Sequence, residues 1–252
     1  VVKPKAGREP MDMFKFVDFC AANGCEGAEL TAYFFPPNLT DDLLLKIRDH
    51  AKKRGVAISG TAIGNVWTHP KGAPERDKEI TSTKQWIDRA AVMGAPHIRV
   101  FAGNAPKGVS LEDATANCIE AYRECAAYAE KKNIVLGMEN HGGIVAEADN
   151  LLKIGRAVDS PAAGVNFDSG NYHTDDPYGD LAKIAPYAVN VQLKMEIKRK
   201  GAKESEPGDI PRVIKILRDA NYQGWFTLEY ETKEDPFVAV PRILKELRPM
   251  LG

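Results

Sequence analysis

Short apolar segments rich in β-branched residues alternate with longer amphipathic stretches along nearly the whole sequence. This alternation constrains the fold most strongly, because parallel strands need a crossover and the crossover is usually a helix. Strands are expected at seven places: residues 26–30, 56–62, 97–102, 134–140, 164–168, 189–194 and 225–231. The pattern therefore predicts one α/β domain over residues 1–252, built around a parallel sheet.

The helices expected between these strands have recognisable ends. The stretch from residue 40 to 54 begins with Thr40, a good N-cap, followed by two aspartates, and it ends at Gly55. Asp209 is expected to cap a later helix that carries Pro211 in its first turn. Further helices are expected over residues 12–23, 81–93 and 111–132.

The seven expected strands are one fewer than a closed (β/α)8 TIM barrel requires. The sequence also begins with a predicted helix, residues 12–23, that no predicted strand precedes. We therefore expect a TIM barrel whose first strand comes before Val1 and is missing from this chain. A true seven-stranded barrel or an open sheet is the alternative.

Charge and hydropathy exclude several classes of partner. Lys and Arg total 34 and Asp and Glu total 35, and no basic stripe follows the sequence, so nucleic acid is not an expected partner. No apolar segment approaches the roughly 18 residues that a transmembrane helix needs, so no membrane contact is expected. We expect a cytoplasmic protein, while the start at Val1 leaves open a targeting segment that has been lost.

A dense run of both charge signs extends from Lys194 to Glu206 and includes Gly201. Such a run is typical of a solvated loop. A lid that covers substrate is the alternative.

Four polar residues stand at the C-terminal ends of successive predicted strands: Glu139, Asp168, Gln192 and Glu229. In parallel barrels these ends form the active-site face, and the alternation of side chains turns these positions inward. Carboxylates buried close together repel one another unless a cation neutralises them. The sequence therefore predicts a divalent metal ion and a metal-assisted enzyme. Neutralisation by Lys194 and Arg99 without a metal is the alternative.

The same segments resemble the xylose isomerase-like TIM barrels, the superfamily of sugar phosphate isomerases and epimerases. The stretches that carry the resemblance are IVLGMENHGG, GVNFDSGNYHTDDPY, VNVQLKMEI and GWFTLEYE, and GCEGAEL and AISGTAIGN suit the same pattern. The resemblance covers almost the whole chain and lacks only the first strand. It is much less specific for the substrate than for the fold and the site.

The resemblance implies a single divalent ion held by Glu139, Asp168, Gln192 and Glu229. It also implies that Glu139 and Glu229 act as acid and base on opposite faces of a substrate carbon. One glutamate would remove a proton next to a carbonyl, giving an enediolate, and the other would return a proton. The expected function is therefore isomerisation or epimerisation of a sugar, keto-sugar or polyol.

The sequence departs from the family at Gln192, where a histidine is usual. A neutral amide oxygen completes an all-oxygen ligand set, which favours Mn²⁺ or Mg²⁺ and leaves Co²⁺ and Zn²⁺ as alternatives. The rival interpretation is that Gln192 only hydrogen-bonds substrate, with the metal loose or absent.

Further polar and aromatic residues are expected on the same face. His141 is a candidate catalytic residue, because an unperturbed imidazole titrates near neutral pH. The expected substrate-binding residues are Trp67, His69, Arg99, His173, Lys194 and Glu231. Trp67 is expected to be an exposed ring that stacks on a sugar, with packing between loops as the alternative. For the charged residues, the alternative is neutralisation of a neighbour, and for the loop histidines an ordinary surface position.

Two other functions stay open. A lyase or dehydratase could use the same enediolate to expel a β-leaving group from a keto-sugar or 3-keto-glycoside, with His141 or His173 as the proton donor. A non-catalytic sugar-binding barrel would bind its ligand without proton exchange. The absence of GxGxxG and GxxxxGK[ST] patterns disfavours nicotinamide chemistry. The expected partner is a small carbohydrate, and assembly into a homo-oligomer stays open.

Overall fold

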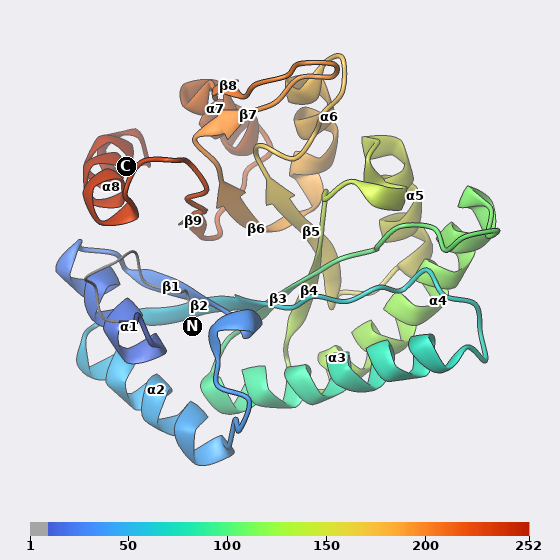
Figure 1. Cartoon of the computed structure of the whole chain (residues 1–252), viewed down its shortest axis with the longest axis horizontal. Coiled ribbons are helices and arrows are strands. Elements are labelled where there is room, and N and C mark those ends of the chain that lie inside the picture. The colour runs from blue at the N-terminus through green and yellow to red at the C-terminus, as the bar shows by residue number, and fades with distance from the viewer. Residues whose placement is uncertain (1–9, 252) are drawn as a thin grey trace.

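Seven parallel strands form one curved sheet in the computed structural model, which describes residues 10–251 (Figure 1). Across the sheet they are β1 (Gly27–Thr31), β2 (Ala57–Ala62), β3 (His97–Val100), β4 (Val135–Glu139), β5 (Ala163–Asp168), β6 (Ala188–Leu193) and β9 (Phe226–Leu228). The strands follow one another in sequence order, with a helix between successive strands. The parallel α/β sheet predicted from the alternation of segments is therefore confirmed.

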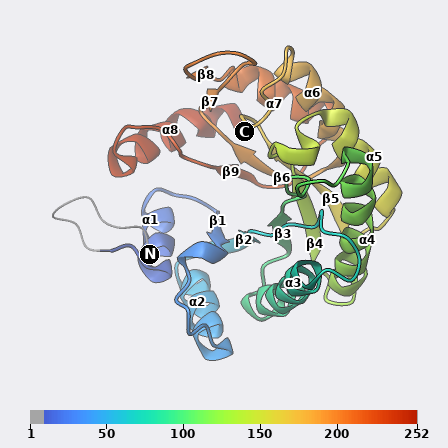
Figure 2. The ribbon, with the colours of Figure 1, turned by 45° about the vertical axis from the view of Figure 1, so that its right-hand side comes forward.

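The helices lie on the outside of the curved sheet (Figure 2). They are α1 (Met13–Ala22), α2 (Asp41–Lys53), α3 (Pro74–Met93), α4 (Leu111–Glu130), α5 (Ala148–Val158), α6 (Pro177–Ile184), α7 (Ile210–Asp219) and α8 (Pro236–Leu251), with short 3-10 turns η1 (Ala32–Phe34), η2 (Gly143–Val145) and η3 (Ala185–Tyr187). The predicted caps form, since Thr40 accepts from the Leu43 amide and Asp209 from the Arg212 amide. Helix α3 begins at Pro74 rather than at residue 81, because a proline fits the first turn of a helix.

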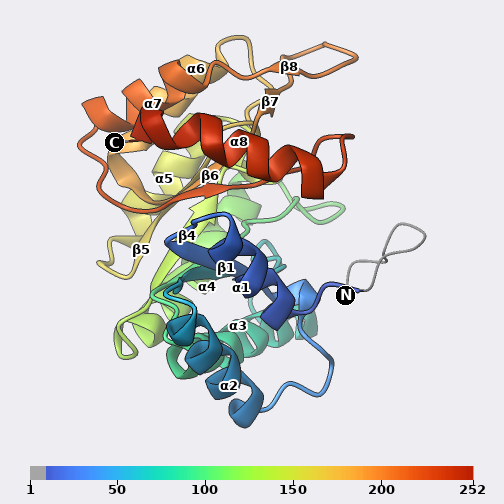
Figure 3. The same ribbon diagram turned by 90° about the vertical axis from the view of Figure 1, so that its left-hand side faces the viewer.

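The sheet is nearly closed into a barrel, and its two ends meet without a backbone ladder between β1 and β9. Helices α1 and α8 lie side by side at this seam (Figure 3). The rings of Phe19 and Phe237 meet edge to face with centroids 5.5 Å apart. Arg248 also donates to the carbonyl oxygens of Asn23 and Gly24 at the end of α1. Side chains of the two helices therefore hold the ends of the sheet together.

Alternate side chains of the strands divide the molecule into an apolar layer and a polar interior. Ile98, Leu136 and Phe167 are fully buried in the apolar core. Asn166 and Gln192, on the other side of their strands, are also buried but belong to a polar group inside the barrel. This alternation positions polar side chains where the strands end. No helix within residues 10–251 is long and apolar enough to cross a membrane.

The charged segment after β6 is more ordered than the expected loop. Residues Glu196–Ile197 (β7) and Glu206–Pro207 (β8) pair as a short antiparallel ladder. Arg199 and Glu206 form an exposed ion pair within this hairpin, with a separation of 2.7 Å. The segment is therefore a solvated hairpin beside the active-site face.

Candidate active site

The C-terminal ends of the strands bring together the four residues that the sequence singled out. Glu139 ends β4 and Asp168 ends β5, while Gln192 pairs with Asp168 in the ladder between β5 and β6. Glu229 comes directly after β9, and its backbone amide donates to the carbonyl of Leu193 at 3.0 Å. Their positions follow from strand register, because neighbouring parallel strands end at the same edge of the sheet.

Lys194 lies at the centre of this group. Its Nζ atom is 3.3 Å from Asp168 Oδ2, 3.5 Å from Glu229 Oε2 and 2.7 Å from Glu231 Oε2. It also donates to Asn171 Oδ1 at 3.0 Å. Three carboxylates and an amide oxygen therefore surround one ammonium group.

Arg99 supplies a second cation, directed at Glu139. Its Nε lies 3.0 Å from Glu139 Oε2, and both side chains are almost fully buried. The guanidinium also donates to the Ile63 carbonyl at 3.1 Å and lies 4.1 Å from the centroid of the Phe101 ring. These contacts fix the orientation of the guanidinium, and through it the orientation of the Glu139 carboxylate.

Asn171 connects the two charged groups, and it was not among the residues predicted from the sequence. Its amide Nδ2 donates to Glu139 Oε1 at 2.6 Å, and its Oδ1 accepts from Lys194. A continuous path of contacts therefore runs from Glu139 through Asn171 and Lys194 to Glu229. The only sequence signal for Asn171 was its place on the loop directly after Asp168.

Burial and charge shift the acid–base properties of these groups. Burial raises the pKa of Glu139 from 4.5 to about 7, although Arg99 opposes the shift, and Glu229 adds repulsion. Burial likewise raises the pKa of Asp168 well above its ordinary value. For Lys194, burial alone would lower the pKa, but Asp168 and Glu229 outweigh it and raise the pKa above 10.5. Lys194 is therefore charged at neutral pH, while Glu139 exchanges a proton near neutral pH.

Gln192 takes part in a different set of contacts, beneath the carboxylates. Its Oε1 accepts from Asn166 at 2.6 Å, and its Nε2 donates to Glu29 Oε1 at 2.7 Å. Asn190 donates to the other Glu29 oxygen at 2.8 Å and to Asn166 Oδ1 at 2.9 Å. Both ends of the Gln192 amide are thus engaged inside the barrel.

The oxygen atoms at the strand ends are the candidate ligands of the predicted divalent metal. Asp168 Oδ2 and Glu229 Oε2 are buried without a hydrogen-bond partner among the described residues, which suits a cation. Both face the Lys194 ammonium, however, and Glu139 faces Arg99. Within residues 10–251, no three His, Cys, Asp or Glu side chains are placed to hold a metal ion. The side chains as arranged do not fit a divalent ion, so metal ligation stays a prediction that these contacts do not support.

Trp67 does not lie where the sequence predicted. Its side chain is 0% exposed, and its ring packs 5.1 Å from the ring of Tyr122. The expectation of an exposed stacking ring is therefore wrong, and the ring packs in the core against helix α4. His69 follows on the same loop and is half-buried.

The other predicted residues lie around the mouth of the barrel to different extents. His141 is exposed, its ring centroid lies 4.6 Å from that of Phe101, and its backbone amide donates to the Glu139 carbonyl. Burial of part of the ring, with Lys194 nearby, lowers the pKa of His141. His173 is exposed on the loop after β5. The side chain of Glu231 is 62% exposed and reaches the site through Lys194.

Buried His97 is a further polar residue that the sequence analysis did not single out. Neither ring nitrogen has a hydrogen-bond partner among the described residues, and burial lowers the pKa of the imidazole to about 3. A Cβ atom on Gly137 would lie 2.5 Å from His97 Nε2. Gly137 therefore leaves room for this ring, and His97 stays neutral inside the barrel.

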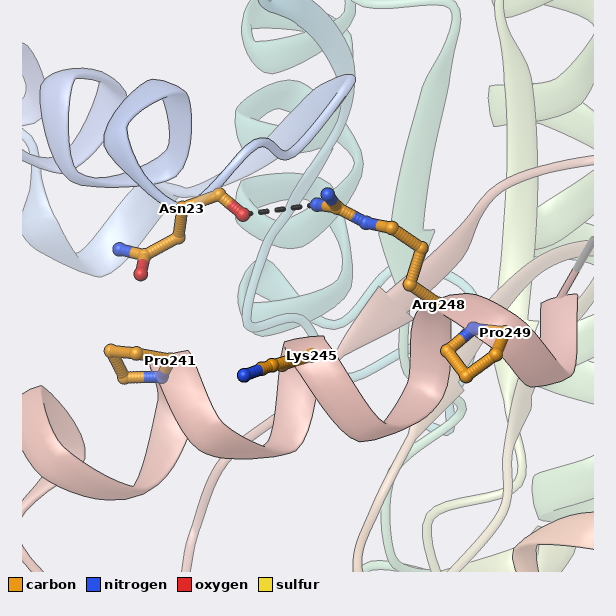
Figure 4. A pocket seen from close by; sticks show the side chains of 5 residues that line it. All are labelled: Asn23, Pro241, Lys245, Arg248 and Pro249. Atoms are coloured by element: carbon orange, nitrogen blue, oxygen red, sulfur yellow. Dashed lines mark hydrogen bonds between the residues drawn. The ribbon is translucent and has the colours of Figure 1, made fainter.

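Two surface cavities lie away from the carboxylates. One, of about 380 Å³, lies between α1 and α8 and is lined by Asn23, Pro241, Lys245, Arg248 and Pro249 (Figure 4). The other lies beside η2 and the start of α4. None of the residues that line these cavities contacts Lys194. The candidate site is therefore identified by the polar side chains at the strand ends and not by a cavity.

Comparison with known proteins places this arrangement in a family. The model of the xylose isomerase-like TIM barrel family matches residues 17–248. An inosose dehydratase of Clostridium perfringens is 26% identical over 175 residues, which are 60% of this chain and 57% of the relative. The chain thus matches little more than half the length of that relative.

Solved structures of the same fold include enzymes and a metal-bound protein. A D-psicose 3-epimerase studied with D-fructose has a TM-score of 0.80 at 16% identity, covering 96% of this chain and 94% of its own. A xylose isomerase-like TIM barrel protein from Mycobacterium smegmatis in complex with magnesium has a TM-score of 0.74 at 21% identity, covering 95% and 89%. With the family match over most of its length, the chain belongs to the xylose isomerase-like TIM barrel family.

Proposed function

We propose that this protein is a sugar-modifying enzyme, an isomerase or epimerase that transfers a proton next to a carbonyl of a sugar, keto-sugar or polyol. One observation carries the proposal: Glu139 and Glu229 approach the same Asn171–Lys194 pair from the two sides. Two carboxyl groups flanking a cationic centre are suited to removing and returning a proton. The named relatives, an epimerase and a dehydratase, support carbohydrate as the substrate class.

The proposed reaction begins with one glutamate as a carboxylate and the other protonated. The carboxylate takes the proton from the carbon next to the carbonyl, and the electron pair of the C–H bond forms the carbon–carbon double bond of an enediolate. The carbonyl oxygen gains the negative charge, which nearby cations stabilise. The second glutamate then donates its proton to carbon. Return to the same carbon on the opposite face gives an epimer. Return to the former carbonyl carbon, together with transfer of the neighbouring hydroxyl proton to the former carbonyl oxygen, gives an isomer.

The remaining polar residues at the mouth are proposed to bind substrate hydroxyls. Arg99 and Glu231 already contact the charged groups of the site, and His173 lies exposed on the loop after β5. His69 is the least supported member of the set, because it follows the buried Trp67. No step of this proposal passes through a metal ion, since the described donors are engaged with Lys194 and Arg99.

Solvent exchange tests the proposal. Ketoses and 3-keto-glycosides incubated with the protein in D₂O should gain one deuterium next to the carbonyl in substrate and product, as followed by NMR. The control is the same panel with the Glu139→Gln and Glu229→Gln double variant. Exchange that persists in the double variant would contradict the assignment, and ligand binding without exchange would identify a non-catalytic sugar-binding barrel.

A dehydratase is the second candidate function, and His141 is the observation that favours it. Its backbone amide is bonded to the Glu139 carbonyl, and its ring is held against Phe101 at the exposed rim. An imidazole there can donate a proton to a departing hydroxyl, as an inosose dehydratase relative would suggest. Loss of water from the substrate, absent in His141→Ala, would favour this function over epimerisation.

A further inference from the structure

We propose that the Lys194 ammonium is the resident cation of this site, occupying the place expected for a divalent ion and binding the developing oxyanion of the substrate directly. The inference rests on the proposed function for the oxyanion, but not for the identity of the cation. It follows from the position of the ammonium, from the backbone that holds the lysine, and from the contacts of Gln192.

Two of the four oxygen atoms around the Lys194 ammonium lie beyond normal hydrogen-bond length. Two contacts, to Glu231 at 2.7 Å and Asn171 at 3.0 Å, have hydrogen-bond lengths. The contacts to Asp168 and Glu229 are longer, at 3.3 and 3.5 Å, and those two oxygens have no hydrogen-bond partner within residues 10–251. An ammonium carries three N–H donors. Glu231 and Asn171 use two of these donors, so the third is shared at longer range between Asp168 and Glu229, and it is the donor that a substrate oxygen would take over on binding.

The local backbone is shaped to hold the lysine. The Lys194 amide donates to Ser169 Oγ at 2.8 Å, and that hydroxyl donates back to the Lys194 carbonyl at 3.3 Å. A Cβ atom on Gly170 would lie 3.0 Å from both Cβ and Cδ of Lys194. The two residues after Asp168 thus anchor the lysine backbone and leave space for its side chain.

Gln192 completes the argument, because it is the position at which the sequence departs from its family. Its amide is bonded at both ends, to Asn166 and Glu29, inside the barrel. A divalent ion bound to Gln192 would lie next to the Lys194 ammonium, which already neutralises the Asp168 carboxylate. The amide at position 192, where the family has an imidazole, and the central position of Lys194 both favour the ammonium group as the cation of this site.

Metal binding tests the identity of the cation without reference to activity. The protein, the Lys194→Met variant and the control Lys215→Met, which removes an exposed lysine paired with Asp219, are titrated with Mn²⁺. Bound metal is measured by electron paramagnetic resonance and elemental analysis, and Tm by thermal unfolding. We expect no stoichiometric Mn²⁺ and an unchanged Tm in the natural protein and in the control. Lys194→Met should bind Mn²⁺ and gain Tm with it, because the ion binds the folded state.

One tightly bound Mn²⁺ per chain in the natural protein would overturn the inference. Should Lys194→Met fail to fold, the titration of the natural protein and of Lys194→Gln decides the question. On a substrate found by the exchange assay, Lys194→Met should lower kcat by about 100-fold or more, as loss of an oxyanion donor does. EDTA should leave the natural rate unchanged. Absence of any exchange would contradict the proposed function alone, since the metal titration would still identify the cation.

Discussion

The carboxylates at the rim of the barrel and the Glu29 carboxylate in the layer beneath differ in whether their buried oxygens have hydrogen-bond partners. Beneath the rim, the buried Glu29 carboxylate accepts one amide hydrogen on each oxygen, from Gln192 and Asn190. At the rim, Asp168 and Glu229 each keep a buried oxygen without a hydrogen bond among the described residues. A buried polar group normally finds its partners, and an exception calls for a functional explanation. The comparison favours a structural role for the lower carboxylate and supports the chemical role proposed for the upper ones.

The largest expected effect is on activity at the rim. Glu139→Gln keeps the shape of the side chain but removes the exchangeable carboxyl proton, so deuterium exchange should fall by about 10²–10⁴-fold. The free energy of unfolding should fall as well, because the new amide leaves Arg99 without its anionic partner and sets an N–H group against a donor, so the rate is counted per folded molecule. NMR measures the exchange rate, and urea unfolding measures the free energy of unfolding. Glu124→Gln, at an exposed ion pair with Lys84, is the control and should change neither. A fall in stability without a loss of rate would place Glu139 with Glu29.

The second prediction concerns the lower layer, where a loss of stability is expected with a smaller loss of rate. Glu29→Gln turns one acceptor oxygen into a donor that faces Asn190 or Gln192, so a buried hydrogen bond is lost. The free energy of unfolding should fall by about 1–3 kcal/mol. The rate per folded molecule should change less than in Glu139→Gln. Equal losses of rate in the two variants would break the distinction between the layers.

The third prediction concerns pH and depends on His97. Its folded pKa of about 3 lies below the ordinary value of 6.5, so below pH 6.5 the unfolded chain binds a proton that the folded protein does not. Stability relative to His97→Gln should therefore fall by about 1.4 kcal/mol for each pH unit below that point, levelling off near the folded value. Glu29, whose pKa is raised to about 7, shifts stability the opposite way in both proteins. Urea unfolding between pH 7.5 and 5 measures the difference, and parallel curves would contradict a neutral buried imidazole.

The strands and the residues at their ends could be predicted from the sequence because they depend on local patterns. β-branched alternation located all the strands of the parallel sheet, and it placed Glu139 and Asp168 at one edge. Loop conformations were less accessible. Asn171 reaches Glu139 only because the loop after β5 turns back over the strand end, and nothing in its spacing encodes that turn.

Trp67 was misplaced for a related reason. Composition suggested an exposed ring beside a histidine, but the loop after β2 turns inward until the ring meets Tyr122 of α4, which is distant in sequence. The sequence could not distinguish the roles of Gln192 and Lys194 either, because they are two residues apart and both side chains point to the inner face of the sheet. Their different partners, amides for one and carboxylates for the other, depend on strands that only the folded barrel brings together.

Side chains, and not a backbone ladder, close the barrel between β1 and β9. Glu29 stands on the first described strand and Glu229 just after the last, and no backbone ladder joins these edges. Outside the sheet, the Arg248 contacts with the end of α1 and the Phe19–Phe237 pair bridge this seam, and inside it Gln192 and Asn190 bond Glu29 to β6. Closure of the barrel at this seam therefore depends on the identity of a few side chains, whereas a backbone ladder tolerates a changed side chain.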